Sequence, residues 1–515
     1  MNVSRILAII QRLFAVFLLL AVVTGAYGQK RVKLKEADAL QSGGKGDGRF
    51  DRLIGNVVLE QNETTIYCDS AHFYKKQNSV EAYGNVRIIE GDSITITGSR
   101  LVYDGDAKTA KLRRNVVFTK LKTATLYTNF LDYARVPNIA NYFNGGRLVD
   151  SVTVLTSKKG YYDVNTSLAS FKDNVVVTHP DYTMYADSMQ YNSRTKDIYF
   201  VSETTVINKD SSRAVYQGGV YNTITKISDL REGVGESEDY TIEGEIYDLD
   251  ATRNIAKVRG NVVMTSKKEN LIIYGQASDY FKDKGITKVY NNAFVAKVTD
   301  DNDTLYVTAD TLVSIDSNDP EKKRILAYHG VKIYKKDLQG VADSLEYRAA
   351  DSTIYFYKDP VLWTQGNQLT ADSISMLIEN NTISKMFLLD NAFVISQDTL
   401  KNFNQIKGRE MTADFAGQNI SQVIVQGNGE SLYFALDEKD QAFMGMNKII
   451  CSNITIRFKE GKVNNLSFYV KPEASFIPPH ELTKEQMTLK GFKWRSDNKP
   501  TRKQVVKKEI EPQPY

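Results

Sequence analysis

A short phrase of Gly, Asn and Val returns along this chain at intervals close to thirty residues. It occurs at Gly55-Asn56-Val57, Gly84-Asn85-Val86, Asn115-Val116, Asn174-Val175 and Gly260-Asn261-Val262. The steps between successive Asn residues are 29, 30, 59 and 87, which lie near one, one, two and three periods. A period of this size is typical of a stacked array, in which each unit buries its apolar face only against its neighbours.

A second phrase alternates with the first. It occurs as Cys68-Asp69-Ser70-Ala71, Ala186-Asp187-Ser188-Met189, Ala342-Asp343-Ser344-Leu345 and Ala371-Asp372-Ser373-Ile374. Between these phrases the apolar residues alternate with a period of two, as in Ile94-Thr95-Ile96-Thr97, which is typical of a strand with one face on a core. The 30 Tyr and 22 Phe also suit pleated, half-buried surfaces. The sequence therefore predicts an all-β fold built from antiparallel repeats of about thirty residues.

The chain divides into five predicted parts. They are a signal peptide at 1–28, a linker at 29–47, a first β half at 48–235, a second β half at 240–470 and a loosely held tail at 471–515. The first part has a basic start at Arg5 and Arg12 and an apolar run from Leu13 to Val23, as secretory signals do. An uncleaved anchor helix is the alternative, but this run is shorter than the ~20 residues needed to span a bilayer. The acidic, Gly-rich segment 231–238 interrupts the repeat, so we place the boundary between the halves there.

Charge and cysteine content exclude several classes of function. Without the predicted signal peptide the formal net charge falls from +4 to +2, and the basic runs lie only near the two ends, at 30–35 and 499–508. A nucleic-acid partner is therefore not expected, although such runs also suit a weak tether to an anionic membrane. The two cysteines, Cys68 and Cys451, rule out a disulfide framework, and we interpret both as small buried apolar residues.

The repeated polar residues point to geometry more than to chemistry. Asn after Gly tolerates the left-handed backbone region, so we expect it where a turn meets a strand. The residues that continue the alternation should face the interior, and they are Val86, Ile88, Ile94, Ile96, Val116, Phe118, Val175, Val177, Val262 and Met264. Alternation places Asp343 on the face of Leu345 and Tyr347. Because a buried, unpaired carboxylate is costly, we expect this Asp at a bend where it accepts hydrogen bonds.

The catalytic inventory is thin. The four His residues lie far apart, and the chain has no metal-ligand spacing, nucleophile elbow or phosphate-binding Gly loop. We therefore predict a protein that is not an enzyme and that uses no cofactor and no metal. Two alternatives stay open: the Asp residues form an acidic ladder for Ca²⁺, or a pair of carboxylates near Asp310 and Asp343 acts on a glycan.

The interleaved phrases, with strings such as Ile94–Asp104 followed by Ala110–Phe118, resemble the OstA/LptA family over about residues 48–460. The resemblance implies an extended, partly open β-jellyroll with an apolar interior that carries the acyl chains of lipopolysaccharide or lipid A. It also implies a periplasmic protein, with outer-membrane association left open, and partners among other jellyroll proteins of lipopolysaccharide transport.

An open sheet also leaves unpaired N–H and C=O groups on its outermost strands, which a partner's strand can pair with. We expect those edges at Gly55, Val57 and Leu59 near the start of the array and at Ile454, Ile456 and Phe458 near its end. Self-association through the same edges is a further expectation.

Three functional hypotheses follow. The first is a lipid-binding conduit, because each exposed CH₂ of an acyl chain costs ~0.8 kcal/mol in water and a groove of apolar side chains would cover such chains. The second is a structural or adhesive β-solenoid whose interior is filled by its own side chains. The third is a β-helical enzyme that acts on polysaccharides.

Overall fold

The computed structural model describes residues 31–506, apart from gaps at 92, 121–123, 239, 269, 300–302, 381, 418, 438–441 and 460–461. The predicted signal peptide lies outside the described residues. Within them the chain is almost entirely β-strand, and the paired strands run antiparallel, so the all-β prediction is confirmed. The strands form two compact units that divide between Lys196 and Asp197.

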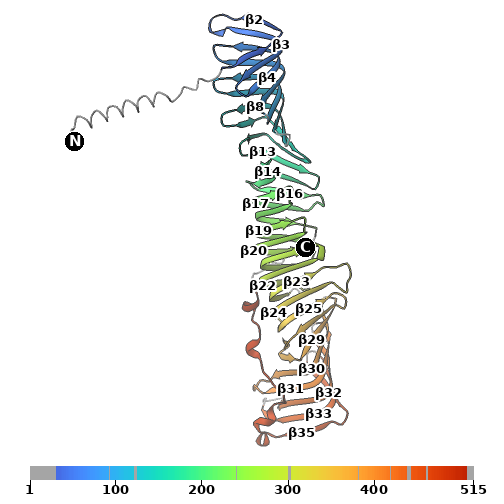
Figure 1. Ribbon diagram of the computed structural model, residues 1–515. Helices are drawn as coiled ribbons and strands as arrows, with labels where there is room; N and C mark the ends of the chain where they lie inside the picture. The colour runs from blue at the N-terminus through green and yellow to red at the C-terminus, as the bar shows by residue number, and fades with distance from the viewer. Residues whose placement is uncertain are drawn as a thin grey trace, which may run out of the picture. The chain divides into compact units, whose positions relative to one another are not determined.

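The first unit is a meander of strands, drawn in blue to green in Figure 1. It contains β1 (Lys33–Glu36), β2 (Ala39–Gly43), β3 (Phe50–Gln61), β4 (Thr64–Tyr74), β5 (Ser79–Glu90), β6 (Ile94–Asp104), β7 (Thr109–Lys120), β8 (Ala124–Ala134), β9 (Ile139–Tyr142), β10 (Gly146–Asp150), β11 (Thr153–Ser157), β12 (Lys159–Asp163), β13 (Leu168–His179) and β14 (Tyr182–Asn192), with the 3₁₀ turn η1 (Gly46–Gly48).

The second unit continues the same pattern. Its strands are β15 (Asp197–Phe200), β16 (Thr204–Asn208), β17 (Arg213–Asn222), β18 (Ile227–Glu236), β19 (Tyr240–Asp250), β20 (Ile255–Ser266), β21 (Leu271–Phe281), β22 (Ile286–Val298), β23 (Thr304–Ile315), β24 (Arg324–Tyr334), β25 (Leu338–Arg348), β26 (Thr353–Tyr357), β27 (Val361–Thr364), β28 (Asn367–Thr370), β29 (Ser373–Glu379), β30 (Thr382–Gln397), β31 (Phe403–Ala416), β32 (Asn419–Leu436), β33 (Phe443–Lys459), β34 (Lys462–Tyr469) and β35 (Glu473–Ile477). Short helical turns complete it, namely η2 (Lys282–Lys284), η3 (Pro479–Glu481), η4 (Lys484–Met487), η5 (Ser496–Asn498) and the helix α2 (Arg502–Val505).

The long strands bend at the repeated phrase. In β5 the ladder to β6 shifts register between Tyr83 and Val86, where Gly84 and Asn85 take positive φ values of 71° and 41°. A Cβ on Gly84 would lie 2.3 Å from a carboxylate oxygen of Asp69, so the close approach also requires glycine. The prediction of left-handed backbone is correct, but the phrase lies inside one strand as a β-bulge and does not mark the junction of a turn with a strand.

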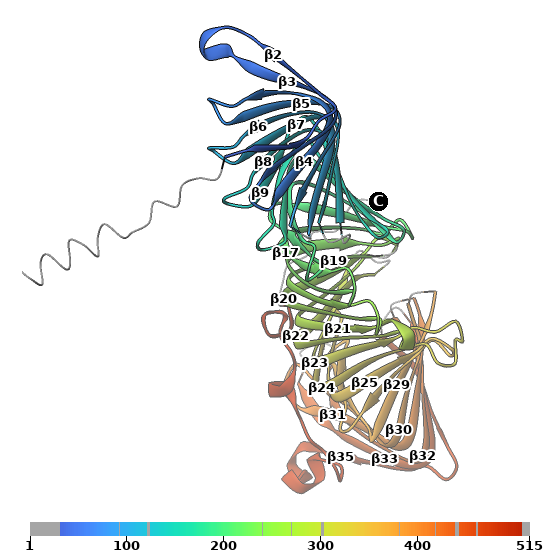
Figure 2. The ribbon, with the colours of Figure 1, turned by 45° about the horizontal axis from the view of Figure 1, so that its top comes forward.

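Each bent strand contributes one half to each of two facing walls. We call the wall that carries Leu59 and Ile88 wall A, and the wall that carries Leu53 and Ala82 wall B. The walls of the second unit keep these names, because its strands continue the same alternation. The hairpins at the outer end of wall A form rim A, which joins β3 to β4 and β5 to β6, and those of wall B form rim B, which joins β4 to β5. Figure 2 shows β3 to β8 side by side with their outer hairpins. One thirty-residue repeat is therefore one strand out and one strand back.

The structure corrects two sequence-based boundaries. The segment expected to be a linker contains β1 and β2, which both pair with β3, because backbone groups can form a ladder even where apolar residues do not alternate. The segment around Gly233, expected at a domain boundary, belongs to β18. Gly233 serves close packing there, since a Cβ would lie 2.4 Å from the ring of Tyr216.

The C-terminal segment is held in place, contrary to the expected loose tail. Residues 478–506, which we call the strap, run back along the outer face of wall A of the second unit, as the orange-red segment in Figure 1 shows. Leu489 of the strap is buried against Phe393, Ile395 and Phe434, and Val505 packs against Phe294. Alternation makes one face of each strand point inward, so the strap covers these apolar residues on the outward face.

Candidate functional site

The interior of the first unit is lined by two continuous files of apolar side chains. Direct neighbours on the ladders make up the file of wall A, which runs through Leu59, Ile66, Ile88, Ile96, Phe118, Leu126, Leu148, Leu155, Val177 and Met184. The facing file of wall B runs through Leu53, Ala71, Ala82, Leu101, Leu112, Leu131 and Tyr142. Because neighbouring strands lie about 4.8 Å apart, each file forms a continuous apolar stripe.

Of the residues predicted to face the interior, Ile88, Ile96, Phe118 and Val177 belong to the wall A file, and the others lie two residues along the same face of their strands or in the second unit. The buried ones are Val86, Ile88, Ile94, Ile96, Val116, Phe118, Val175, Val177 and Val262, while Met264 is half-buried and packs against the core of the second unit. Burial on the inward face does not by itself make them ligand contacts, so their lipid-binding role stays a prediction.

The second unit has the same two files. On wall A it runs through Ile242, Met264, Ile273, Val295, Val307 and Ile333. On wall B it runs through Leu230, Tyr247, Val258, Ser278, Val289, Leu312, Ala327, Leu345, Phe356 and Ile374. The hydroxyl of Tyr247 donates to the carbonyl oxygen of Ile242 at 3.1 Å, so this side chain reaches from wall B to wall A.

The interior of the first unit is filled by its own side chains. A cavity of about 20 Å³ lies between Phe118, Leu126, Tyr142 and Phe171, and it has room for about one water molecule. The walls of this unit would therefore have to separate before an acyl chain could lie between them.

The two rims of the first unit are joined by a ladder of polar contacts. Gln61 Nε2 donates to the carbonyl oxygen of Gly105 at 2.8 Å, and Arg135 forms an ion pair with Glu90. Gln61 and Glu90 belong to rim A, whereas their partners belong to rim B. We call these contacts rungs.

Two further rungs follow along the same seam. Lys120 donates to the carbonyl oxygen of Val164 and to Ser167, and burial lowers the pKa of its ammonium group. Lys196 Nζ lies 2.6 Å from Asp150 Oδ2. The rim A members stand 29, 30 and 30 residues apart, so the seam gains one rung per repeat. The sequence analysis missed these four rim A residues because Gln, Glu, Lys and Asp are different residue types and form no repeated motif. Their spacing nevertheless follows the period of the repeat.

Tyrosines seal this seam from the inside. Tyr103 donates to Gln61 Oε1 at 2.5 Å, and Tyr191 donates to Asp150 Oδ2 at 2.6 Å. Burial raises the pKa of Tyr103 to about 12, so its hydroxyl remains protonated and able to donate. The seam of the first unit thus has a polar latch on its outer side and an aromatic layer beneath it.

At the bend the two repeated phrases contact each other. Asn85 Nδ2 donates to Asp69 Oδ2 at 2.9 Å, and Asn391 Nδ2, at the corresponding register shift of β30, donates to Asp372 Oδ2 at 2.9 Å. Asp343 faces outward at a bulge, which interrupts the alternation that placed it with Leu345. It accepts from Lys358 Nζ at 3.1 Å, which lowers the pKa of its carboxyl group. The expectation of a hydrogen-bonded carboxylate at a bend is therefore correct, but the donor is a Lys and not the expected backbone N–H or Ser hydroxyl, and the expectation of a shared face is wrong.

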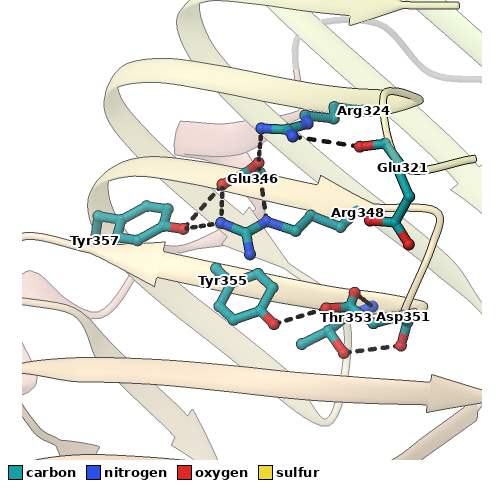
Figure 3. A network of polar contacts seen from close by, with 8 residues as sticks. All are labelled: Glu321, Arg324, Glu346, Arg348, Asp351, Thr353, Tyr355 and Tyr357. Carbon is teal, nitrogen blue, oxygen red and sulfur yellow. Dashed lines mark hydrogen bonds and ion pairs between the residues drawn. The ribbon is translucent and has the colours of Figure 1, made fainter. Parts of the chain in front are cut away.

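The carboxylates of the second unit are used in structural pairs. Figure 3 shows the largely buried Glu346 held by Arg324, Arg348 and Tyr357. The hydrogen bond from Arg348 is the main cause that lowers the pKa of this carboxyl group. Within the described ranges, no three His, Cys, Asp or Glu side chains gather to hold a metal ion. Nor does any described helix have the length and apolar character to cross a bilayer.

The edges of the sheet differ from the predicted ones. Gly55, Val57 and Leu59 belong to β3, which pairs with β4 on one side and with β1 and β2 on the other. Ile454, Ile456 and Phe458 belong to β33, which pairs with β32, β34 and β35. Sequence reasoning stopped too early at both ends, because the outer strands are polar or irregular.

At the C-terminal end the outermost strands expose apolar side chains. Leu466 of β34 and Phe476 of β35 are exposed. Both cysteines are free and buried, as interpreted from the sequence.

Part of the first unit is similar to a known protein family. Residues 29–187 match a family model described as OstA-like protein. Among solved structures, the chain is similar to LptH of Pseudomonas aeruginosa, described as the LptA homologous periplasmic component of the lipopolysaccharide transport device. That alignment has 14% identity and a TM-score of 0.21 and covers 23% of this chain and 82% of LptH. The WD40 domain of SCAP from fission yeast aligns at 7% identity with a TM-score of 0.09, covering 83% of this chain and 98% of that one.

No curated protein matches the chain. The two structural alignments are too weak to carry an argument, so the assignment depends on the family model and on the interleaved phrases. The match over residues 29–187 agrees with the family resemblance that the repeated phrases predicted.

Proposed function

We propose that this protein is a periplasmic lipid-binding conduit that shields the acyl chains of lipopolysaccharide on their way to the outer membrane. The observation that carries the proposal is the pair of inward-facing files inside each unit, which are apolar apart from Ser278 on wall B of the second unit. The OstA-like match over residues 29–187 supports the same proposal. Partners of the same type would add strands at the outermost edges of the sheet.

The physical argument concerns the cost of exposing a lipid. Transfer of a fourteen-carbon acyl chain from an apolar environment into water costs roughly 10 kcal/mol of free energy. A file such as Ile273, Val295 and Val307 offers nearly the same contact at every strand, so a chain between the walls has no strongly preferred position. Nearly uniform affinity permits sliding along the file, which a conduit needs and a storage site does not.

The filled interior of the first unit favours a second candidate, a structural β-solenoid. Rungs such as Glu90 with Arg135 hold the rims together around a packed core, which is what a load-bearing or adhesive array requires. The two candidates differ in one measurable respect, because a solenoid of this kind takes up no lipid.

Photo-crosslinking separates the candidates. A benzoylphenylalanine at Met264, on the inward face of β20, should attach to lipid A offered in vesicles to the purified protein. The same probe at Val263, its half-buried outward neighbour on the same strand, is the matched control and should not attach. Retention of no acylated lipid, with no attachment at Met264, would refute the conduit and leave the solenoid.

A further inference from the structure

The two units differ in how their seams are closed. In the first unit the last inward position of wall B before rim B is occupied in successive repeats by Tyr103, Tyr133, Tyr162 and Tyr191, whose exposed fractions are 2%, 3%, 8% and 1%. These rings lie beneath the rungs, and no more than a few per cent of each reaches solvent.

In the second unit Tyr280 occupies the equivalent position and is open to solvent, and so is Ile325, the first inward residue of wall B after rim B. Tyr280 of β21 lies on the inward face, because it shares the face of the buried Ser278 on the same strand, yet it is 40% exposed. Ile325 of β24 shares the face of the buried Ala327, yet it is 46% exposed. Their neighbours between them on the ladder, Thr287 and Ser314, are half-buried.

Wall A of the same stretch also presents an inward side chain to solvent. Tyr240 of β19 shares the face of Ile242 and is 42% exposed. The apolar file behind it continues inward through Met264 to Ile273. From β19 to β24 both walls therefore carry exposed apolar side chains beside the buried core of the unit, with Thr287 and Ser314 between those of wall B.

Cations lie beside this opening. The turn η2, directly after Tyr280, carries Lys282 and Lys284 on the surface, and the Asp283 between them accepts a hydrogen bond from Asn254 at 2.8 Å. On the opposite wall Lys297 shares the inward register of Val295. An apolar opening with ammonium groups beside it is complementary to an amphiphile with acyl chains and an anionic head.

We propose that the seam of the second unit between β19 and β24 is the mouth through which the acyl chains of a phosphate-bearing amphiphile enter the interior. The inference rests on the proposed function and adds to it a place of access and a headgroup class. Acyl chains that lie between the walls of the first unit cannot leave through its closed seam. In the second unit, Tyr240, Tyr280 and Ile325 mark the place where lipid and solvent exchange.

The first test blocks the mouth. Ile325→Cys, modified with a bulky maleimide, should slow the uptake of fluorescent lipid A from vesicles about tenfold. Tyr328→Cys with the same label is the control, because Tyr328 lies on the same strand, is 39% exposed and faces outward. Equal uptake by the two labelled variants would overturn the mouth while leaving the conduit intact. If the unmodified protein takes up no lipid A, the conduit fails, and the mouth fails with it.

The second test addresses the headgroup. Lys282→Glu combined with Lys284→Glu should slow the uptake of phosphorylated lipid A about tenfold and leave that of a fluorescent neutral diacylglycerol unchanged. The assignment of an anionic headgroup would be overturned if the uptake of both probes were slowed equally, or if the uptake of neither were slowed. Circular dichroism and an unchanged melting temperature would show that the variant is folded.

Discussion

Asn85 donates its side-chain amide to the carboxylate of Asp69, with 2.9 Å between Nδ2 and Oδ2, and this bond connects the two phrases that repeat along the chain. Asn85 has a positive φ at the bulge of β5, and Asp69 lies beside it at the bulge of β4. The bond therefore holds neighbouring bends in line, so that the interior files stay in register. The same kind of bond between an acid and an amide joins Asn56 to Asp38 and Asn261 to Glu245.

Replacing Asn85 should show the two parts of its role. Asn85→Ala removes the amide hydrogen bond and places Ala in the left-handed region, which Asn tolerates better because its side chain forms local hydrogen bonds. We therefore expect the free energy of unfolding to fall by about 2 kcal/mol. Asn85→Gly keeps the backbone freedom and should lose about 1 kcal/mol or less. Urea unfolding followed by circular dichroism gives both values. Equal losses would contradict a backbone role for this residue.

The rung between Glu90 and Arg135 should contribute measurably to the stability of the first unit, because both side chains are largely buried. A double-mutant cycle with Glu90→Ala and Arg135→Ala should give a coupling energy of about 1–3 kcal/mol.

The exposed pair of Lys35 and Glu60 is the control for this cycle, and its coupling should stay below about 1 kcal/mol. A coupling for the rung as small as that of the control would mean that the rims are not latched at this position.

The stability of the first unit should fall in alkaline solution. Burial raises the pKa of Tyr103 and of Tyr142 to about 12, above the ~10 of an unfolded tyrosine. Their contribution is complete below pH 10 and is lost as the pH rises from 10 towards 12, because the unfolded chain releases these protons first. Each such group adds a slope of up to about 1.4 kcal/mol per pH unit in that window. Urea midpoints measured at pH 8, 10 and 11 should show the fall, and Tyr103→Phe should reduce its slope.

The strap should detach when its glutamine clamp is removed. Gln405 donates to the carbonyl oxygen of Met487 at 2.9 Å and accepts from the backbone N–H of Leu489 at 2.8 Å, and it is fully buried. Gln405→Ala should cost about 3 kcal/mol, because it leaves two backbone groups of the strap without partners.

Hydrogen exchange reads this effect directly, since the amide of Leu489 should exchange faster in Gln405→Ala. The exposed Gln397→Ala is the control and should leave that amide protected. Unchanged protection of Leu489 in both variants would show that apolar packing alone holds the strap.

The thiol of Cys68 should be inert in the folded protein. Burial is the main cause that raises its pKa to about 12, so about one molecule in ten thousand carries a thiolate at pH 8. Iodoacetamide should leave Cys68 unmodified in buffer and modify it promptly in concentrated urea. Rapid modification at pH 8 without denaturant would show that the interior of the first unit opens readily.

The local pattern of the sequence predicted the interior because alternation is a property of one strand. Ile96 and Val177 could be assigned to the inward face from their immediate neighbours alone. The same rule failed at Asp343, where the register shift between β24 and β25 interrupts the alternation. Bulges follow from how two strands pair, so a single strand does not reveal them.

The contacts across the seam could not be predicted in the same way. Gln61 meets a turn 44 residues away, and only the arrangement of both walls determines which turns face each other. The strap illustrates a similar difficulty, because Gln368 accepts from the backbone N–H of Arg495 across 127 residues. Spacing at the period of the repeat identifies rung candidates, but their partners require the fold.

The rungs also restrict how a protein of this type changes length. Each rung joins positions 44 to 47 residues apart, which is about one and a half repeats, so it connects a hairpin of one rim to a hairpin of the other rim. Deleting a whole thirty-residue unit would leave the remaining latches with suitable counterparts. Deleting a single strand would move every later hairpin from one rim to the other. Residues that now pair across the seam would then lie on the same rim. Gain and loss of sequence in such arrays should therefore come in pairs of strands.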